Sequence, residues 1–459
     1  MAPALSGPRK KSFYKLLWPY VGEIFLAIAT AYLTTQMLAW AGDIPAGSVG
    51  VANQVINMFY LVFQIISNGA GIVMAQSIGA KTPGLKQKIA TVSIFFAAIL
   101  GLIGAIVIIF LGKPLLIAMN LEPIIVELGS EYMFYVGIFF FTQSISFAVS
   151  QMVYSFSETK TGLIGTIFSE IANLGLNAIL IFGVPALGIP ALGVVGAAIG
   201  TIVGRLIYFG FVMNFLFRKK HLVPDFKLLK PFPKDVAKKI LFAGLPATGE
   251  NITYTVAQLV ILSFIGLIGT YAVIAKSYFD TIAVVTYMFA NGLAGATAIY
   301  VGQDVGAGDY DQAKKTVAHS LFLSVITTVI PSFILIFTVT LIARFFTDDP
   351  QIIQTMGTIA IVDIFLEAGR AVSLIVGRSL KASGDAKFTL FTGIIVQWTF
   401  VVPLAYVLCF VVGWGMVGIW IAIAADECIR SFIMFLRWKS GRWQSKTIVK
   451  ANIDTGSVL

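Results

Sequence analysis

Long apolar runs restrict this chain to one class of fold. Stretches of about 18 apolar residues or more recur along its length, and each can cross the hydrocarbon core of a bilayer, which is about 30 Å thick. Hydrophobic residues make up 58% of the 459 residues and charged residues only 12%, whereas a soluble globular chain carries about 25% charged residues. The short alternating segments of a membrane β-barrel do not occur in the sequence. We therefore predict an all-α polytopic membrane protein.

The apolar runs divide into twelve predicted membrane helices. An even number of spans returns the chain to its starting side of the membrane. The predicted segments are residues 14–41, 49–80, 89–119, 124–156, 162–182, 193–217, 240–266, 270–305, 316–346, 352–380, 388–412 and 416–436.

The two halves of the sequence resemble each other. Gln76 in AQSIGA matches Gln303 in GQDVGA, 227 residues later, and Glu158 in SETK matches Asp385 in GDAK at the same offset. The long polar stretch between the halves carries eight Lys and Arg residues. We expect three parts: an N-lobe at residues 1–217 with six helices, a cytoplasmic basic linker at 218–239, and a C-lobe at 240–459 with six helices and a short cytoplasmic tail.

The net charge of +10 is explained by the distribution of basic residues. With a cytoplasmic N-terminus, 26 of the 32 Lys and Arg residues fall on the predicted inner side, as the positive-inside rule requires. Only Lys113 and Arg344 lie clearly on the predicted outer side of the membrane. The pattern predicts a multi-pass protein of the cell membrane with both termini cytoplasmic. Its surroundings are the lipid bilayer, and nucleic acid is not an expected partner.

Three residues inside the predicted N-lobe helices interrupt the apolar pattern. Pro19 predicts a bend in the first helix because proline leaves a backbone carbonyl without its helical donor; the bend is either structural or a moving hinge. Arg205 and Glu170 are predicted at similar depths, where a charge is expensive unless it is paired or hydrated. We expect them to form a structural pair and consider a role in transport as the alternative.

Several motifs resemble one family of transporters. The second predicted helix with its following loop, the segment NLGLNAILIFGVPALGIPALGVVGAAIGTIVGR (Asn173 to Arg205) and SLKASGDAKF (Ser379 to Phe388) are similar to those of the multidrug and toxic compound extrusion (MATE) family, of bacterial or archaeal type. The resemblance implies two six-helix lobes related by a pseudo-two-fold axis around a V-shaped cleft. It also implies a monomer that exports cationic, amphipathic compounds, driven by H⁺ or Na⁺.

The family's N-lobe acids are replaced in this chain. The resemblance aligns a helix 1 aspartate with Thr34 and a helix 5 aspartate with Asn177. Asn173 and Asn177 share a helix face at i, i+4; their amides can bind a polar substrate but cannot titrate. We expect Thr34, Asn173, Asn177 and Gln36 to line the substrate cleft, together with Tyr254, which aligns with the family's helix 7 acid.

The intramembrane acids lie in the C-lobe. Asp363, Glu367 and Arg370 recur at i, i+4 and i+7, which places them on one helical stripe, and LEAGRA (Leu366 to Ala371) resembles a bacterial branch with an E-x-G-R helix 10. One arginine cannot neutralise two carboxylates and Glu250 as well. A surplus acid in a low-dielectric region holds a proton or attracts a cation. We expect Glu250 and Glu367 to carry the coupling ion, which could be Na⁺, while Arg370 sets their affinity.

Two further readings of these acids stay open. Glu367 and Arg370 could form an ion pair that only holds the predicted helix at residues 352–380 in position. Asp280, on helix 8, is a weaker candidate for the coupling site because it could be solvated.

The leading functional hypothesis is a secondary active exporter of organic cations, coupled to H⁺ or Na⁺ by rocking of the two lobes. The alternative is a flippase for lipids or lipid-linked precursors, which would need a cationic cleft for phosphate headgroups. A channel or a receptor fits the duplication poorly. GAKT (Gly79 to Thr82) lacks the frame of an ATP-binding loop, so we expect no ATP-driven pump. We also expect no enzyme, no catalytic residues, no cofactor and no metal-ligand spacing beyond the candidate Na⁺ site.

Overall fold

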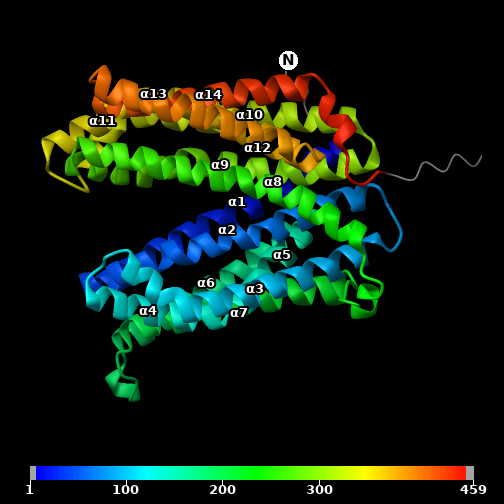
Figure 1. Cartoon of the computed structure of the whole chain (residues 1–459), viewed down its shortest axis with the longest axis horizontal. Helices are drawn as coiled ribbons and strands as arrows, with labels where there is room; N and C mark the ends of the chain where they lie inside the picture. The colour runs from blue at the N-terminus through cyan, green and yellow to red at the C-terminus, as the bar shows by residue number, and fades with distance from the viewer. Residues whose placement is uncertain (1–6, 451–459) are drawn as a thin grey trace, which may run out of the picture. The chain divides into compact units, whose positions relative to one another are not determined.

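The computed structural model describes residues 7–450, and within them almost the whole chain is helical (Figure 1). The outermost parts of the two predicted cytoplasmic ends, residues 1–6 and 451–459, lie outside the described residues. The helices are α1 (Gly7–Ala41), α2 (Asp43–Gly79), α3 (Leu85–Ala118), α4 (Pro123–Ile138), α5 (Phe140–Ser155), α6 (Thr159–Phe182), α7 (Gly193–Asn214), α8 (Lys234–Ile268), α9 (Thr270–Ala307), α10 (Tyr310–Ala343), α11 (Pro350–Ser383), α12 (Ala386–Ile395), α13 (Val402–Tyr406) and α14 (Gly415–Lys439).

These helices account for the twelve predicted spans. By length and composition, nine helices qualify as membrane spans, and a tenth is added when α4 and α5, bent by 58° at Phe139, count as one. The predicted eleventh helix is α12 and α13 with two π-helical segments, Val396–Val401 and Val407–Val411. The remaining two predicted spans correspond to α11 and α14, which carry buried charges.

The described chain divides into two compact units. The N unit comprises Trp18–Ile78 and Thr82–Leu245. The C unit comprises the described parts of residues 1–17 and 246–459 together with Gly79–Lys81. These limits differ from the predicted lobes at both ends: the start of α1 belongs to the C unit, whereas the basic linker and the start of α8 belong to the N unit.

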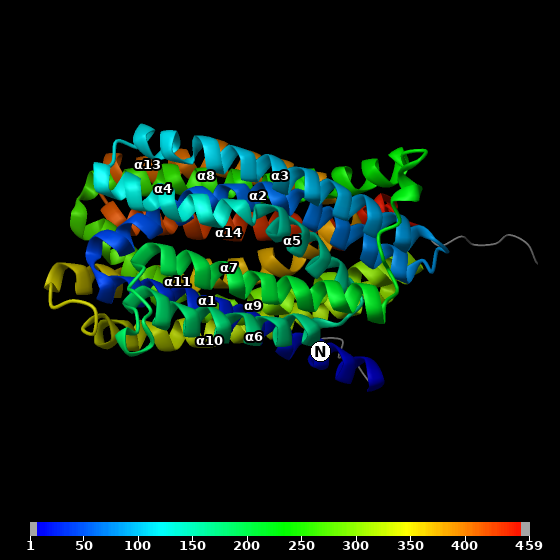
Figure 2. The same ribbon diagram turned by 90° about the horizontal axis from the view of Figure 1, so that it is seen from below.

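In the N unit, α6 packs closely on α7 (Figure 2). Small residues at four-residue spacing let two membrane helices approach, and three glycines of α7 supply them here. A Cβ atom on Gly196 would lie 2.6 Å from the backbone of Leu180, and one on Gly204 would lie 2.8 Å from the carbonyl oxygen of Ser169. Between them, Gly200 faces the side chain of Asn177.

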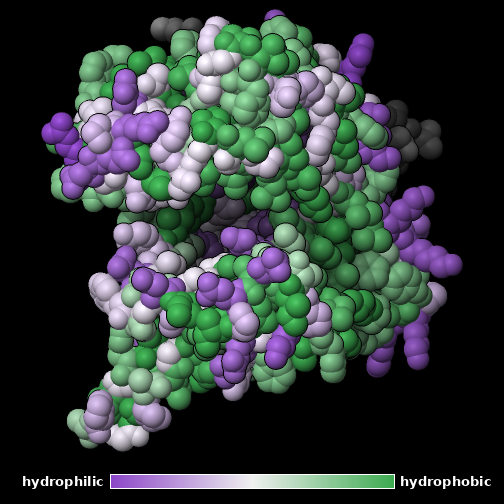
Figure 3. Space-filling model, turned by 60° about the vertical axis from the view of Figure 1, so that its left-hand side comes forward, coloured by the Kyte–Doolittle hydropathy of each residue, from purple (hydrophilic) through white to green (hydrophobic). Residues whose placement is uncertain are grey.

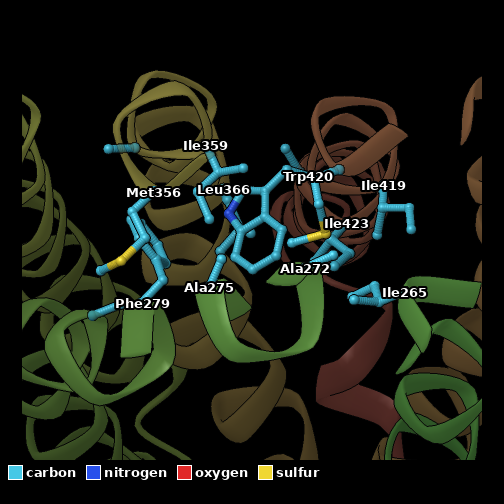
Figure 4. Packing of buried hydrophobic residues seen from close by; sticks show 14 of the residues in the cluster. Ile265, Ala272, Ala275, Phe279, Met356, Ile359, Leu366, Ile419, Trp420 and Ile423 are labelled. Carbon is cyan, nitrogen blue, oxygen red and sulfur yellow. The ribbon is translucent and has the colours of Figure 1, made fainter. Parts of the chain in front are cut away.

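In the C unit, a buried cluster joins α9, α11 and α14. Figure 4 shows the Trp420 ring surrounded by small and aliphatic side chains, with Phe279 in the same cluster. The rings of Phe279 and Trp420 meet edge to face, with centroids 5.5 Å apart, a favourable geometry for aromatic pairs. This packing fixes the parts of α11 and α14 that carry the charged residues described below.

Large apolar side chains cover much of the exterior. On the face drawn in Figure 3 hydrophobic residues form broad areas. Phe110 of α3 is 73% exposed and Phe337 of α10 is 70% exposed. Apolar patches of this extent mark a surface that water does not cover, and with spans of this length the protein is a multi-pass membrane protein.

Candidate functional site

Five buried acids of the C unit gather on α8, α11 and α14. Both ends of α11 are fixed by local sequence: Asp349 caps its first turn by accepting from the Gln351 amide at 2.8 Å, and Gly384, with φ of 101°, ends it in the left-handed region. Only glycine adopts that conformation readily. These five are Glu250 of α8, Asp363 and Glu367 of α11, and Asp426 and Glu427 of α14, while Asp304 and Asp385 are buried elsewhere in the unit.

Glu250 lies between two cations. Its Oε2 is 3.1 Å from Lys381 Nζ, and its Oε1 is 3.9 Å from a guanidinium nitrogen of Arg430. Arg430 also pairs with Glu427 at 2.7 Å and with Asp426 at 3.2 Å. This network therefore holds three carboxylates against two cations.

The second group of charges lies on α11. Glu367 is fully buried and forms an ion pair with Arg370, whose guanidinium also lies 4.7 Å from the centre of the Tyr287 ring. Asp363, one turn before Glu367, accepts a hydrogen bond from Trp420 Nε1 at 3.3 Å. One oxygen of each acid, Oδ2 of Asp363 and Oε2 of Glu367, is buried without a hydrogen-bond partner.

The two groups together contain more carboxylates than cations. The acids are the five named above, and the cations paired with them are Arg370, Lys381 and Arg430. An ionised carboxylate in a low-dielectric region is costly unless it is paired. A proton or a bound cation is therefore needed to balance the surplus, and the free oxygens of Asp363 and Glu367 are where it can bind.

The structure brings together only some of the predicted coupling residues. Asp363, Glu367 and Arg370 share one stripe as predicted, but no ion pair or hydrogen bond in the described part of the chain joins Glu250 to Glu367. Glu250 instead pairs with Lys381, which lies just beyond the end of the predicted helix at residues 352–380. A usable signal was the eleven-residue spacing from Arg370 to Lys381, which returns to the same helix face. Asp280 is exposed and pairs with Lys276 on the next turn.

The predicted substrate residues of the N unit form a polar row between α1 and α6. Asn177 Nδ2 donates to Asn173 Oδ1 at 2.9 Å and to Thr34 Oγ1 at 3.3 Å. The row continues to Glu170, whose Oε2 accepts from Asn173 at 3.4 Å. Gln36 lies near this row in sequence and is half-buried. Tyr254 belongs to the other unit, where the Arg430 guanidinium lies 5.4 Å from its ring centre.

The predicted Glu170–Arg205 pair is replaced by other contacts. Among the described residues no ion pair joins the two side chains. The Glu170 carboxylate is bound by the neighbouring amide of Asn173, and the Arg205 guanidinium lies 5.3 Å from the centre of the Tyr60 ring. A cation over an aromatic face is stabilised without a carboxylate, which accounts for the difference from the expectation.

Duplicated membrane spans with buried, charge-unbalanced acids define a polytopic transport protein. The MatE family model matches residues 19–179 and 246–407, and the chain belongs to this family of transporters. The two matched segments begin 227 residues apart, the same offset as the sequence echoes, and this agreement confirms the duplication.

Known relatives match over nearly the whole chain. An uncharacterized transporter, YisQ, from Bacillus subtilis (strain 168) is 31% identical, covering 96% of this chain and 97% of the relative. A probable multidrug resistance protein, NorM, from Thermotoga maritima is 27% identical over 96% of this chain and 94% of its own length. A solved outward-facing MATE transporter superposes with a TM-score of 0.87 at 19% identity, covering 96% of this chain and 97% of that one.

Proposed function

We propose that this protein is a secondary active multidrug exporter for organic cations, coupled to an inward flow of H⁺ or Na⁺. The observation that carries the proposal is the surplus of buried carboxylates over cations in the C unit. The name of the Thermotoga maritima relative, a probable multidrug resistance protein, supports the substrate class. Rocking of the two lobes would expose a central cleft to each side in turn. The protein would act as a monomer in the plasma membrane, with both termini cytoplasmic.

The coupling ion would bind at Asp363 and Glu367. Their free oxygens are buried and belong to neighbouring turns of α11. A proton or Na⁺ there would neutralise one negative charge beside Arg370, and its loss would leave a site that attracts a cation. Glu250, which already has Lys381 and Arg430 beside it, would tune this balance rather than bind the ion directly.

The substrate would contact polar and aromatic groups. The row of Thr34, Asn173 and Asn177 offers amide and hydroxyl groups that bind a polar substrate without changing charge. Aromatic rings of the cleft would hold flat cations through their faces. The charge on an organic cation would compete with the coupling ion for the same surplus of negative charge, which is the requirement for exchange of one for the other.

The flippase alternative has less support from the site. A phosphate headgroup needs free cations, and Arg370 of α11 and Arg430 of α14 are each bound by buried carboxylates. Lys381 is likewise bound by Glu250. The buried charge groups of α8, α11 and α14 contain more carboxylates than cations, which suits a cationic substrate.

The test is uptake of an ethidium-type dye into inverted membrane vesicles under separately imposed pH and Na⁺ gradients. One gradient should drive accumulation in the wild type, and Glu367→Gln should abolish it while expression stays normal. Asp280→Asn is the matched control, because that acid is exposed and paired on its own helix; it should accumulate dye like the wild type. Intact transport in Glu367→Gln with only lowered thermal stability would mean that Glu367 is a structural partner of Arg370. No accumulation by the wild type under either gradient would contradict the exporter.

A further inference from the structure

A second buried acid, outside the C-unit site, lies in the N unit. Glu23 occupies α1 four residues after Pro19 and is enclosed by hydroxyl groups from three other helices. Its Oε1 accepts from Tyr154 of α5 at 2.5 Å and from Tyr208 of α7 at 3.2 Å. Thr166 of α6 contacts the same oxygen at 3.4 Å. Four helices thus converge on one carboxyl group.

No cation in the described part of the chain balances this carboxylate. Among the described residues, no lysine, arginine or histidine lies within ion-pair distance of Glu23, unlike Glu250 or Glu367. The titratable groups that face it are Tyr154 from α5 and Tyr208 from α7, whose hydroxyls are 2.9 Å apart. From α6 come the Thr166 hydroxyl and the bare Gly162, and on α1 itself Tyr20 packs edge to face against Tyr154.

The second carboxyl oxygen of Glu23, Oε2, is buried and has no hydrogen-bond partner among the described residues. It lies beside Gly162, where a Cβ atom would be 2.7 Å from Oε2 and 2.7 Å from the Tyr154 hydroxyl. Any side chain at this position of α6 would displace the carboxyl group or the phenol. The glycine therefore lets α6 lie close against an oxygen that carries a negative charge when Glu23 is ionised.

The arrangement favours a proton over a metal cation. The three hydroxyls direct hydrogens towards Oε1, and the free Oε2 faces a residue without a side chain. A metal ion at Oε2 would find few oxygen ligands, and hard cations require several. A proton needs only the one oxygen, and its binding removes an uncompensated buried charge.

We propose that Glu23 is a proton-binding site of the N unit, distinct from the coupling acids of the C unit. When the site is open to the side of the membrane with the higher proton activity, a proton from water binds Oε2 and an O–H bond forms there. The same bond breaks on the other side, the proton leaves to water, and the hydroxyls of Tyr154, Tyr208 and Thr166 stabilise the carboxylate that remains. This inference rests on the proposed ion-coupled export and names H⁺ as an ion that the N unit carries.

The first test reads protonation without transport. Full-length protein in lipid nanodiscs is titrated with acid while its infrared difference spectrum is recorded. The carbonyl-stretch band of a protonated carboxylic acid should appear on acidification and be lost in Glu23→Gln. Glu158→Gln is the control, because that exposed acid pairs loosely with Lys220 at 3.9 Å, and it should leave the band unchanged. A band unaffected by Glu23→Gln overturns the assignment.

Two further variants keep the test decisive if Glu23→Gln does not fold. Tyr154→Phe removes the 2.5 Å hydrogen bond, and Gly162→Ala presses a methyl group against Oε2 and the Tyr154 hydroxyl; both should shift the pH at which the band appears. A titration that neither variant moves overturns the proposal.

A transport measurement separates this proposal from the exporter itself. In inverted vesicles, Glu23→Gln should lose dye accumulation driven by a pH gradient while the purified variant still binds the dye. Wild-type vesicles that accumulate no dye under any gradient would refute export, whereas the infrared titration would still establish or refute the proton site. Unchanged pH-driven accumulation in Glu23→Gln would overturn a role for Glu23 in coupling.

Discussion

The buried acids of α8, α11 and α14 differ in how they are paired. Among the described residues, Glu250, Asp426, Glu427 and Glu367 each have a cation at ion-pair distance, whereas no ion pair joins Asp363 to a cation. The paired acids are held in place by partners that would themselves be left charged and buried. Asp363 can exchange a ligand without uncovering a protein cation, and Glu367 can do so at its free Oε2 while Oε1 stays beside its arginine.

Arg430 is the residue on which the structural network depends. Replacing it by methionine, which is similar in length, would leave Glu250, Asp426 and Glu427 with Lys381 as their one remaining cation. Breaking a buried pair costs about 3–5 kcal/mol because a buried charge loses its partner. We expect Arg430→Met to lower the thermal unfolding temperature in detergent strongly.

The control for this prediction is Lys314→Met. Lys314 pairs with Asp311 at the exposed start of α10, and an exposed pair contributes about 0–1 kcal/mol. Equal shifts of the unfolding temperature in the two variants would mean that the Arg430 network adds no more than a surface ion pair.

At this scale the sequence predicts which residues are charged but not how they pair. The i, i+4, i+7 spacing placed Asp363, Glu367 and Arg370 on one stripe because helix geometry is local. The Glu250–Lys381 pair joins α8 to α11 across 131 positions of sequence, and no local pattern specifies it. Glu23 lies inside the predicted helix at residues 14–41, but its three hydroxyl partners come from three other helices, so no spacing in the sequence indicates its site.

At the scale of helices, the contact of α6 with α7 depends on space rather than on charge. Gly200 faces Asn177, and a Cβ atom there would lie 2.2 Å from Asn177 Oδ1. Asn177 is also the residue that joins the polar row to Thr34. The same close approach therefore packs two membrane helices and orients a proposed substrate-binding amide.

Gly200→Ala should disturb both features at once. Forcing an extra methyl group into a close-packed interface costs about 1–3 kcal/mol, so we expect a lower unfolding temperature and weaker dye binding by the purified protein. Gly210→Ala, on the same helix with nothing within 4 Å of the added atom, should leave both measurements unchanged. Wild-type stability in Gly200→Ala would mean that α6 and α7 separate easily at this point.

Helix boundaries followed the apolar runs, whereas interruptions within helices did not. The break at Phe139 lies in the apolar sequence GIFFF (residues 137–141), which contains no proline and no polar side chain. The π-helical segment Val396–Val401 is accompanied by a proline. Pro403 lacks an amide hydrogen, so the carbonyl of Thr399 loses its helical donor. Prediction from sequence could have reached the second irregularity but not the first.

For the molecule as a whole, two prolines mark where the chain passes from one unit to the other. Residues up to Leu17 of α1 group with the C unit, and those from Trp18 group with the N unit. In α8 the change falls between Leu245 and Pro246. Pro19 and Pro246 lie inside continuous helices and are 227 residues apart, so both copies of the repeat place a proline at this passage.

A proline inside a helix removes one backbone hydrogen bond and makes that turn the easiest to bend. If movement of the units requires bending at these turns, Pro246→Ala should restore the bond and stiffen α8. An Ala–Pro difference of about 3 kcal/mol in a helix interior is ample for a tenfold slowing, which needs about 1.4 kcal/mol of added barrier.

We therefore expect a dye-uptake rate in inverted vesicles that is about tenfold lower in Pro246→Ala, with equilibrium dye binding unchanged, and a similar effect in Pro19→Ala. Pro331→Ala is the matched control, because Pro331 also lies inside a helix, α10, but all of that helix belongs to the C unit. Equal slowing by Pro331→Ala would show that any loss of a proline impairs transport. A normal rate in both Pro19→Ala and Pro246→Ala would mean that the units move without bending α1 or α8 at these turns.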